Sequence, residues 1–215
     1  MMTVDTGAGS TQGNQDRCES KLDRLRAPHV EPLNALVEQW RGEMPGRLIP
    51  WFDPDDAGIC ARVLVLMESP GPRTVRAGGS GFCSEDNDDG TARTFARLRR
   101  HAGLQRSAYL RWNIVPWAVH DRSGAWTAPG VGDLDAAQPA LAQLLATLPA
   151  LELVIVMGQR ALAGYMRHVT VSAPERVLPV LATPHPSQRN TRSRDEAITR
   201  ISNALAYAAD LCPAY

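Results

Sequence analysis

The stretch 63–72 reads VLVLMESPGP: an unbroken apolar run followed by Glu68, Ser69 and a Pro-Gly-Pro turn. An apolar run of this length, bounded by turn residues, is typical of a strand that is buried on both faces. Three further segments have the same character, at 109–115 (YLRWNIV), 151–157 (LELVIVM) and 177–182 (VLPVLA). We therefore expect four buried strands spread along the chain.

Segments with helical spacing separate these strands. Apolar residues at helical intervals predict helices over 32–41, 91–102, 133–148, 158–168 and 194–211. Strands that alternate with helices need crossover connections, and such connections give a parallel sheet covered on both faces. The predicted fold class is α/β, a three-layer α/β/α arrangement with a central, mainly parallel sheet of four strands.

The length and the charge of the chain limit its domain organisation and its possible binding partners. The 215 residues carry 23 basic and 23 acidic side chains, so net charge gives no reason to expect nucleic acid, and such a partner would need local basic patches. Residues 1–27 are rich in glycine and polar side chains, and we expect a disordered tail there, followed by one domain over 28–215. No apolar run is long enough to cross a membrane. We expect a cytoplasmic monomer without a membrane partner.

The residues after each strand are the place to look for a site, because ligands bind beyond the carboxyl ends of parallel strands. His185 lies between two prolines, so it belongs to a rigid turn rather than to a helix or a central strand. This setting favours a catalytic role over a structural one. Asn113 lies in an apolar strand, where its amide needs a partner, either a ligand or backbone groups.

Several familiar sites are not indicated. The glycine-rich phosphate loops are missing, and Ser69 lacks the flanking glycines of a hydrolase nucleophile. The cysteines at 18, 60, 83 and 212 contain no C-x-x-C pair, which favours buried thiols over a zinc site or disulfides. The acidic run 85–90 resembles a calcium loop only weakly. Its alternative interpretation is a solvated loop in which Asp89 or a neighbour caps the following helix.

Taken together and in order, the strand-end segments resemble the uracil-DNA glycosylase superfamily. The segment 68–71 (ESPG) looks like its first motif, of the G-E-A-P-G type, and Phe82 is similar to the aromatic residue that stacks on a flipped base. Asn113, within WNIVPW, resembles the asparagine that reads the pyrimidine edge. Residues 154–158 resemble a late core strand, and 185–187 (HPS) the final motif. The resemblance spans roughly 63–205.

The resemblance implies an enzyme that hydrolyses the N-glycosidic bond of uracil, or of a related deaminated base, in DNA. Such enzymes flip the base out of the stack into a pocket. By this analogy Phe82 stacks on the base, while Glu68 and Asn113 belong to the base-binding set. His185 would donate to the base oxygen on which negative charge grows.

DNA contacts are implied for two segments. Pro70, Gly71 and Pro72 would pinch the DNA backbone. The segment from Ser187 onward would enter the minor groove, with Arg189 and Arg192 supplying the local positive charge.

The sequence also departs from the family pattern. Ser69 stands where some branches carry an activating Asp or Asn, which leaves two hypotheses for the attacking water. Either a polar residue after Phe82 positions it, with Glu85, Asn87 or Asp88 as candidates and Glu85 and Asn87 preferred, or charge stabilisation supplies most of the rate and Ser69 only orients water. We favour the loop residue. The cysteine spacing does not match the iron–sulfur branches, so we expect no cluster and no cofactor.

Two other functions remain open. Because of Ser69, the chain could be a non-catalytic nucleic-acid or nucleotide-binding module with a degenerate glycosylase pocket. The same α/β pocket could also serve a hydrolase or transferase acting on free nucleosides, although the arginines after Ser187 argue against it.

Overall fold

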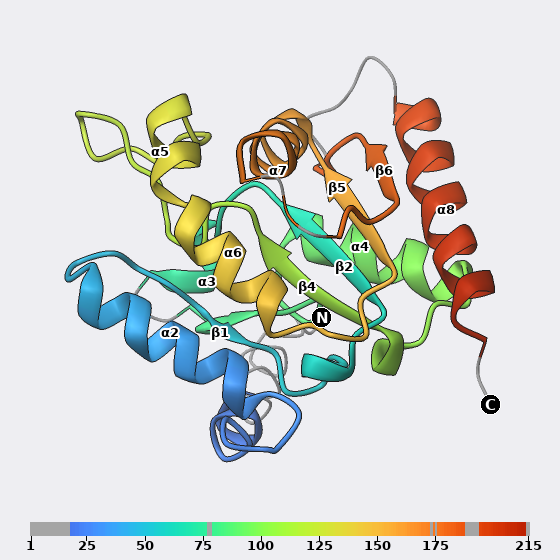
Figure 1. Cartoon of the computed structure of the whole chain (residues 1–215), viewed down its shortest axis with the longest axis horizontal. Helices are drawn as coiled ribbons and strands as arrows, with labels where there is room; N and C mark the ends of the chain where they lie inside the picture. Colours follow the sequence, from blue (N-terminus) through green and yellow to red (C-terminus); the bar gives the residue numbers. More distant parts are fainter. Residues whose placement is uncertain (1–17, 77–78, 173, 175, 188–193, 214–215) are drawn as a thin grey trace, which may run out of the picture.

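A central sheet of four parallel strands organises the molecule (Figure 1). In the computed structural model, which describes residues 18–76, 79–172, 174, 176–187 and 194–213, the strand order is β4-β2-β5-β6. Their bounds are Tyr109–Asn113 for β4, Val63–Met67 for β2, Leu153–Met157 for β5 and Val180–Thr183 for β6. Every residue of β2, β4 and β5 is buried, as the unbroken apolar runs predict.

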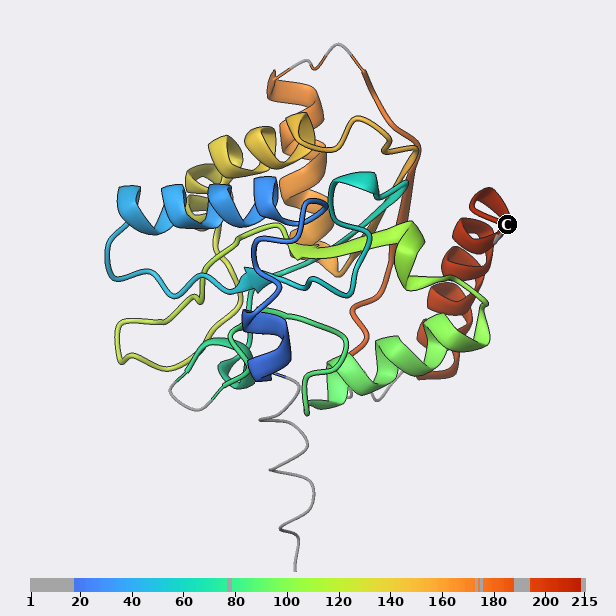
Figure 2. The ribbon, with the colours of Figure 1, turned by 90° about the horizontal axis from the view of Figure 1, so that it is seen from below.

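Helices cover both faces of this sheet, and the fold class is the predicted three-layer α/β/α (Figures 1 and 2). One face carries α2 (Glu31–Glu43), α5 (Val131–Ala136), α6 (Gln138–Ala146) and α7 (Gln159–Ser172), and the other carries α4 (Gly90–His101) and α8 (Arg194–Leu211). Side chains alternate along each strand, so Leu64 and Leu66 join the first core while Val63 and Val65 join the second.

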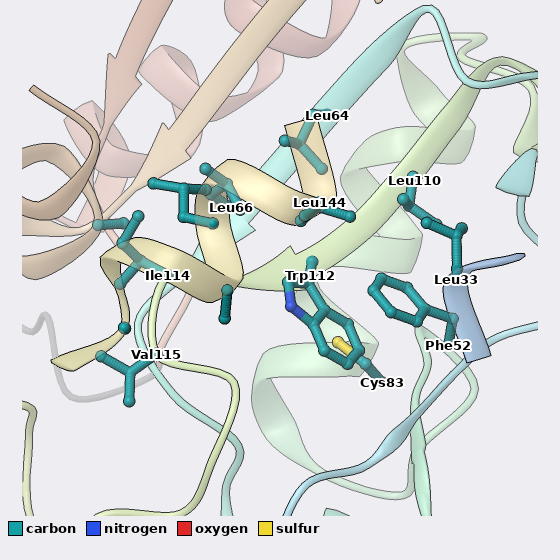
Figure 3. Close-up of a cluster of buried hydrophobic side chains, with 14 of the residues drawn as sticks. Leu33, Phe52, Leu64, Leu66, Cys83, Leu110, Trp112, Ile114, Val115 and Leu144 are labelled. Atoms are coloured by element: carbon teal, nitrogen blue, oxygen red, sulfur yellow. The ribbon is translucent and has the colours of Figure 1, made fainter. Parts of the chain in front are cut away.

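A small second sheet lies beside the end of β4. It consists of β1 (Trp51–Phe52) and β3 (Phe82–Cys83), which pair in parallel. The Phe52 ring stacks on Trp112 with 3.6 Å between ring centroids, and this contact ties the small sheet to the central one (Figure 3). Strands of two residues show no readable alternation, which is why the sequence analysis missed them.

The helix predicted over 133–148 is two helices, α5 and α6. Pro139 stands in the first turn of α6, where it has no backbone N–H to continue the hydrogen bonding of α5. Three short elements were also not predicted: the 3-10 turns Gly58–Cys60 and Arg106–Ala108, and α3 (Pro72–Val75). The remaining predicted helices agree with the structure to within a few residues.

The predicted disordered tail is wrong for residues 18–27. Residues 18–22 form a helical turn, and Lys21 is only 4% exposed. Its Nζ donates to Asp53 and Asp86, each at 2.7 Å, and to Ser84 at 2.9 Å. The segment is held by ion pairs rather than by an apolar stripe, so hydrophobic periodicity could not reveal it. Residues 1–17 lie outside the described residues.

No helix in the described part of the chain combines the length and the apolar character that a membrane crossing requires.

Candidate active site

A cavity of about 490 Å³ opens at the carboxyl ends of β2 and β4. We call it the strand-end cavity. Its volume falls in the range of roughly 300–1,000 Å³ that is usual for small-molecule sites. Residues predicted from the sequence line it: Ser69, Pro70, Gly71, Pro72, Asn113, His185 and Ser187. The cavity therefore lies at the predicted strand ends, and His185 and Ser187 reach it from the edge of the sheet, after β6.

His185 contributes a neutral imidazole to this cavity. Burial lowers its pKa below the ordinary value of 6.5; the carboxylate of Glu68 opposes this shift, the Arg111 cation adds to it, and Asp89 opposes it. The net direction is downward, so the ring is uncharged at pH 7. A neutral imidazole keeps one N–H donor, which is the form suited to stabilising a developing anion.

Asn113 is the last residue of β4 and pairs in register with Met67 of β2. The side chain is 5% exposed. Its Nδ2 donates to the Cys83 Sγ at 3.6 Å, so β3 holds one end of the amide. The sequence left the partner of this amide open between a ligand and backbone groups; the partner in the structure is a thiol, and a ligand would approach from the cavity that Asn113 lines.

Arg111 lies two residues before Asn113, on the same face of β4, and also lines the cavity. It is buried, and its Nη2 donates to the Ser84 carbonyl at 2.5 Å. Within the described residues, Nε and Nη1 have no hydrogen-bond partner. Arg111 was not among the residues predicted from the sequence. The available signal was a charged side chain inside an otherwise apolar strand, where a buried cation needs compensation.

Asp89 is the acidic residue that lines the cavity. It is the N-cap of α4 and accepts the backbone N–H of Ala92 at 2.8 Å. The helix cap agrees with the prediction that Asp89 or a neighbour caps this helix, whereas no catalytic role was predicted for Asp89. Because one carboxylate oxygen caps the helix, the side chain is held in a fixed orientation at the cavity wall.

Glu85 does not line the cavity, and the prediction that it positions water there is wrong. Its carboxylate accepts two hydrogen bonds of 2.7 Å from Arg99 and one of 2.9 Å from the Tyr109 hydroxyl. Burial alone would raise the pKa of Glu85, but the Arg99 hydrogen bonds and charge, with Tyr109, outweigh it and the pKa is lowered. The residue is half of a buried ion pair behind the cavity wall.

Asn87 is also a structural residue rather than a cavity residue. Its Nδ2 donates to the Phe82 carbonyl at 3.0 Å and to the Thr74 hydroxyl at 3.2 Å, which joins the loop after β3 to α3. Glu85 and Asn87 are thus both committed elsewhere. The third candidate, Asp88, is exposed, pairs with Arg73 and Arg93, and does not line the cavity. The acid that reaches the cavity is Asp89.

Phe82 is placed wrongly by the sequence analysis. Its side chain is 1% exposed and is not part of the strand-end cavity, whereas the next residue, Cys83, lines it. Neighbouring residues of a strand point to opposite sides, so Phe82 points away from the cavity that Cys83 lines. The expected convergence of Phe82 with Asn113 and His185 does not occur.

Glu68 lines a neighbouring cavity of about 590 Å³, which shares His185 with the first. Its Oε1 accepts the backbone N–H of Arg160 at 3.4 Å, near the start of α7. Gly158, with φ +102°, permits this approach, because a Cβ there would lie 2.6 Å from Oε1. Glu68 thus acts on His185 through its charge and does not line the cavity that contains Asn113.

Residues 54–208 match the sequence pattern of the uracil DNA glycosylase superfamily. The chain belongs to this superfamily. The match contains His185, Asn113 and Asp89 within one continuous range. No curated protein matches the sequence.

The fold of this superfamily member resembles that of SMUG2 from Pedobacter heparinus, at a TM-score of 0.52 and 12% identity, over 86% of this chain and 85% of that one. A candidate uracil DNA glycosylase from Methanosarcina acetivorans, solved in solution, matches at a TM-score of 0.44 and 14% identity, over 69% of this chain and 91% of that one.

Within the described residues of this superfamily member, one cluster of side chains is close enough together to hold a metal ion. It consists of the carboxylates of Asp53, Asp55 and Asp86. Lys21, Arg106 and Arg24 form ion pairs with the three carboxylates, so protein cations already balance their negative charge. The four cysteines are free thiols and belong to no group of three or more metal ligands within the described structure. The predicted DNA-contacting residues Arg189 and Arg192 lie outside the described residues.

Proposed function

We propose that the protein is a DNA glycosylase that hydrolyses the N-glycosidic bond of uracil, or of a related deaminated base, after the base has flipped out of the DNA. The observation that carries the proposal is the meeting of His185, Asn113 and Asp89 in one cavity, in a chain of the uracil DNA glycosylase superfamily. Membership alone supports a glycosylase role in general. The three side chains support the specific chemistry.

The cavity suits a base that arrives from outside. Pro70, Gly71 and Pro72 form part of its lining directly after β2, and Arg73 beside them is exposed. Rigid backbone next to an exposed arginine is a suitable surface for a sugar-phosphate strand, because arginine pairs with phosphate while proline keeps the turn in place. The base would then enter between this turn and the His185 turn.

His185 would stabilise the leaving base. As the bond between the sugar C1′ and the base nitrogen breaks, its electron pair stays on the base, and negative charge spreads to the base oxygen. The neutral His185 N–H donates to that oxygen. A preorganised donor of this kind typically contributes about 2.7–4 kcal/mol to the transition state. Asn113 would hold the edge of the same base.

Asp89 would position the attacking water. Its cap bond to Ala92 uses one oxygen, which leaves the other for a water at the cavity wall. The water oxygen bonds to C1′, Asp89 accepts the released proton, and the departing base anion takes a proton from the solvent. This assignment replaces Glu85 and Asn87 with the acid that reaches the site.

The experiment measures release of free base from oligonucleotides that carry one uracil, single- or double-stranded. Wild-type protein should release uracil without added metal, and His185→Ala and Asp89→Asn should lose most of the rate. Asp23→Asn is the control, because Asp23 is an exposed aspartate that lines neither cavity. Tight binding of uracil DNA without release would instead identify a binding module. Release from free nucleosides alone would identify a small-molecule hydrolase.

A further inference from the structure

The floor of the strand-end cavity carries a buried cation that the chemistry above does not use. Arg111 is 5% exposed, its Nη2 donates to the Ser84 carbonyl, and the Cys83 thiol is a further hydrogen-bond neighbour of its guanidinium. Nε and Nη1 lie within the protein without an acceptor in the described part of the chain. Leaving buried donors unpaired is costly, so a cavity with such a group at its floor is suited to a ligand that supplies an acceptor.

Asn113 offers the complementary group beside it. Arg111 and Asn113 are alternate residues of β4, so both side chains leave the strand on the same face. The Cys83 thiol accepts the Asn113 Nδ2 at 3.6 Å, and this contact turns the amide so that Oδ1 is the end left for a ligand. Burial raises the pKa of Cys83 to about 11 despite the nearby Arg111, so the thiol stays protonated and neutral.

A donor next to an acceptor selects one kind of base edge. Guanidinium groups only donate, and the carbonyl oxygen of an amide only accepts. Their partner is therefore a carbonyl oxygen beside a ring N–H, which is the lactam edge that deamination creates. Cytosine presents the reverse order, an amino donor beside a bare ring nitrogen, and would place donor against donor and acceptor against acceptor.

We propose that Arg111 determines specificity for lactam bases by donating to the carbonyl that adjoins the N–H read by the Asn113 Oδ1, with Cys83 as the positioning residue for the amide. For uracil this carbonyl is O4, on the opposite side of N3–H from the oxygen assigned to His185. This inference rests on the proposed glycosylase function and adds the residue that reads the second carbonyl.

The test pairs a change in the base with a change in the protein. Oligonucleotides carry uracil, 4-thiouracil or 2-thiouracil, because sulfur is a poor acceptor at whichever position it replaces oxygen. The release rates are corrected for the uncatalysed hydrolysis of the three nucleosides. The corrected rate of the wild-type protein should be at least about tenfold lower for 4-thiouracil than for uracil. Arg111→Met should lose this discrimination at position 4 and leave the response to 2-thiouracil unchanged.

Controls separate the possible failures. Arg97→Met removes an exposed arginine outside the cavity and should keep the wild-type pattern. If wild type releases no base, the proposed function itself fails. If it releases uracil but Arg111→Met keeps the same discrimination at position 4, the role of Arg111 is refuted while the glycosylase stands. If Arg111→Met does not fold, the wild-type protein alone still tests the proposal. Equal corrected rates of uracil and 4-thiouracil release by wild type would refute the role of Arg111.

Cys83 is tested through base choice rather than through rate alone. Cys83→Ala frees the Asn113 amide to turn, so the preference for uracil over cytosine should fall by about tenfold. Cys83→Ser keeps an acceptor for Nδ2 and should restore most of the preference. An unchanged preference in Cys83→Ala would refute the positioning role, whereas a purely structural effect would lower stability without altering the preference.

Discussion

Asp89 accepts the backbone N–H of Ala92 at 2.8 Å while its side chain also lines the cavity that contains His185. The two functions can be separated by one substitution. Asp89→Asn keeps an oxygen for the helix cap but loses the charge, so stability should change little while the rate of uracil release falls by about 10²–10⁴. Single-turnover rates and thermal melting of the same preparations measure both effects.

The opposite pattern would contradict this assignment. A large loss of stability with an unchanged rate in the folded fraction would make Asp89 a helix cap only. Asp89→Ala provides the second comparison, because it removes cap and charge together and should cost about 1 kcal/mol of stability in addition to the rate.

The pH dependence of base release should follow the protonation of the His185 ring. Its pKa is lowered, so kcat/KM should hold down to pH 6.5 and fall only at lower pH, as the ring gains its proton. The Glu68 carboxylate opposes the lowering, so Glu68→Gln should move this acid limb to still lower pH. Glu196→Gln, at another acid of the neighbouring cavity, is the matched control. A limb that moves upward in Glu68→Gln would rule out this coupling.

The ion pair between Glu85 and Arg99 should matter for stability. Glu85→Gln leaves the buried Arg99 cation without its counter-charge, which typically costs about 3–5 kcal/mol. The rate per folded molecule should remain at the wild-type value, because Glu85 does not line the cavity. Urea unfolding gives the first quantity and active-site titration the second. A selective loss of rate without loss of stability would return Glu85 to the catalytic set.

Asp56 should make the folded protein less stable as the pH rises. Burial, with the nearby Asp53 charge, raises its pKa from 3.8 to about 8, although Arg106 opposes the shift. Between these values the folded state binds a proton that the unfolded chain has released, so the contribution to stability falls as pH increases from about 4 to about 8.

Asp56→Asn removes this titration. Its unfolding free energy should therefore rise relative to wild type between pH 5 and pH 8. Asp55→Asn should change the pH dependence of the unfolding free energy in the opposite direction. The pKa of Asp55 is lowered, so its contribution to stability is lost as the pH falls. Urea titrations at the two pH values compare the variants, and an identical pH slope in wild type and Asp56→Asn would disprove the shift.

The sequence predicts the layers of this fold well because they follow from hydrophobic periodicity. The buried runs specify β2 and β5 closely, and the proline-bracketed His185 and the buried Asn113 point to the strand ends. The small sheet of β1 and β3 is too short for such a pattern. The orientation of β3 places Cys83 rather than Phe82 in the cavity lining, and this could not be read from the sequence.

The same limit explains the acidic loop. Glu85, Asn87 and Asp89 are all plausible from the sequence, since each is a polar residue shortly after Phe82. The structure shows that two of these residues are already paired: Glu85 with Arg99 of α4, and Asn87 with Thr74 of α3. Arg111 was overlooked because apolar neighbours dominate the strand pattern, although a buried charge is itself informative.

Lys21 is the only lysine in the sequence, and its amine is enclosed by Asp53 and Asp86. Amine-directed dyes and crosslinkers will therefore find no accessible side-chain amine on the folded domain. Acylation of Lys21 would instead require the N-terminal turn to detach from the domain. The rate of labelling at this residue therefore measures how often that turn opens.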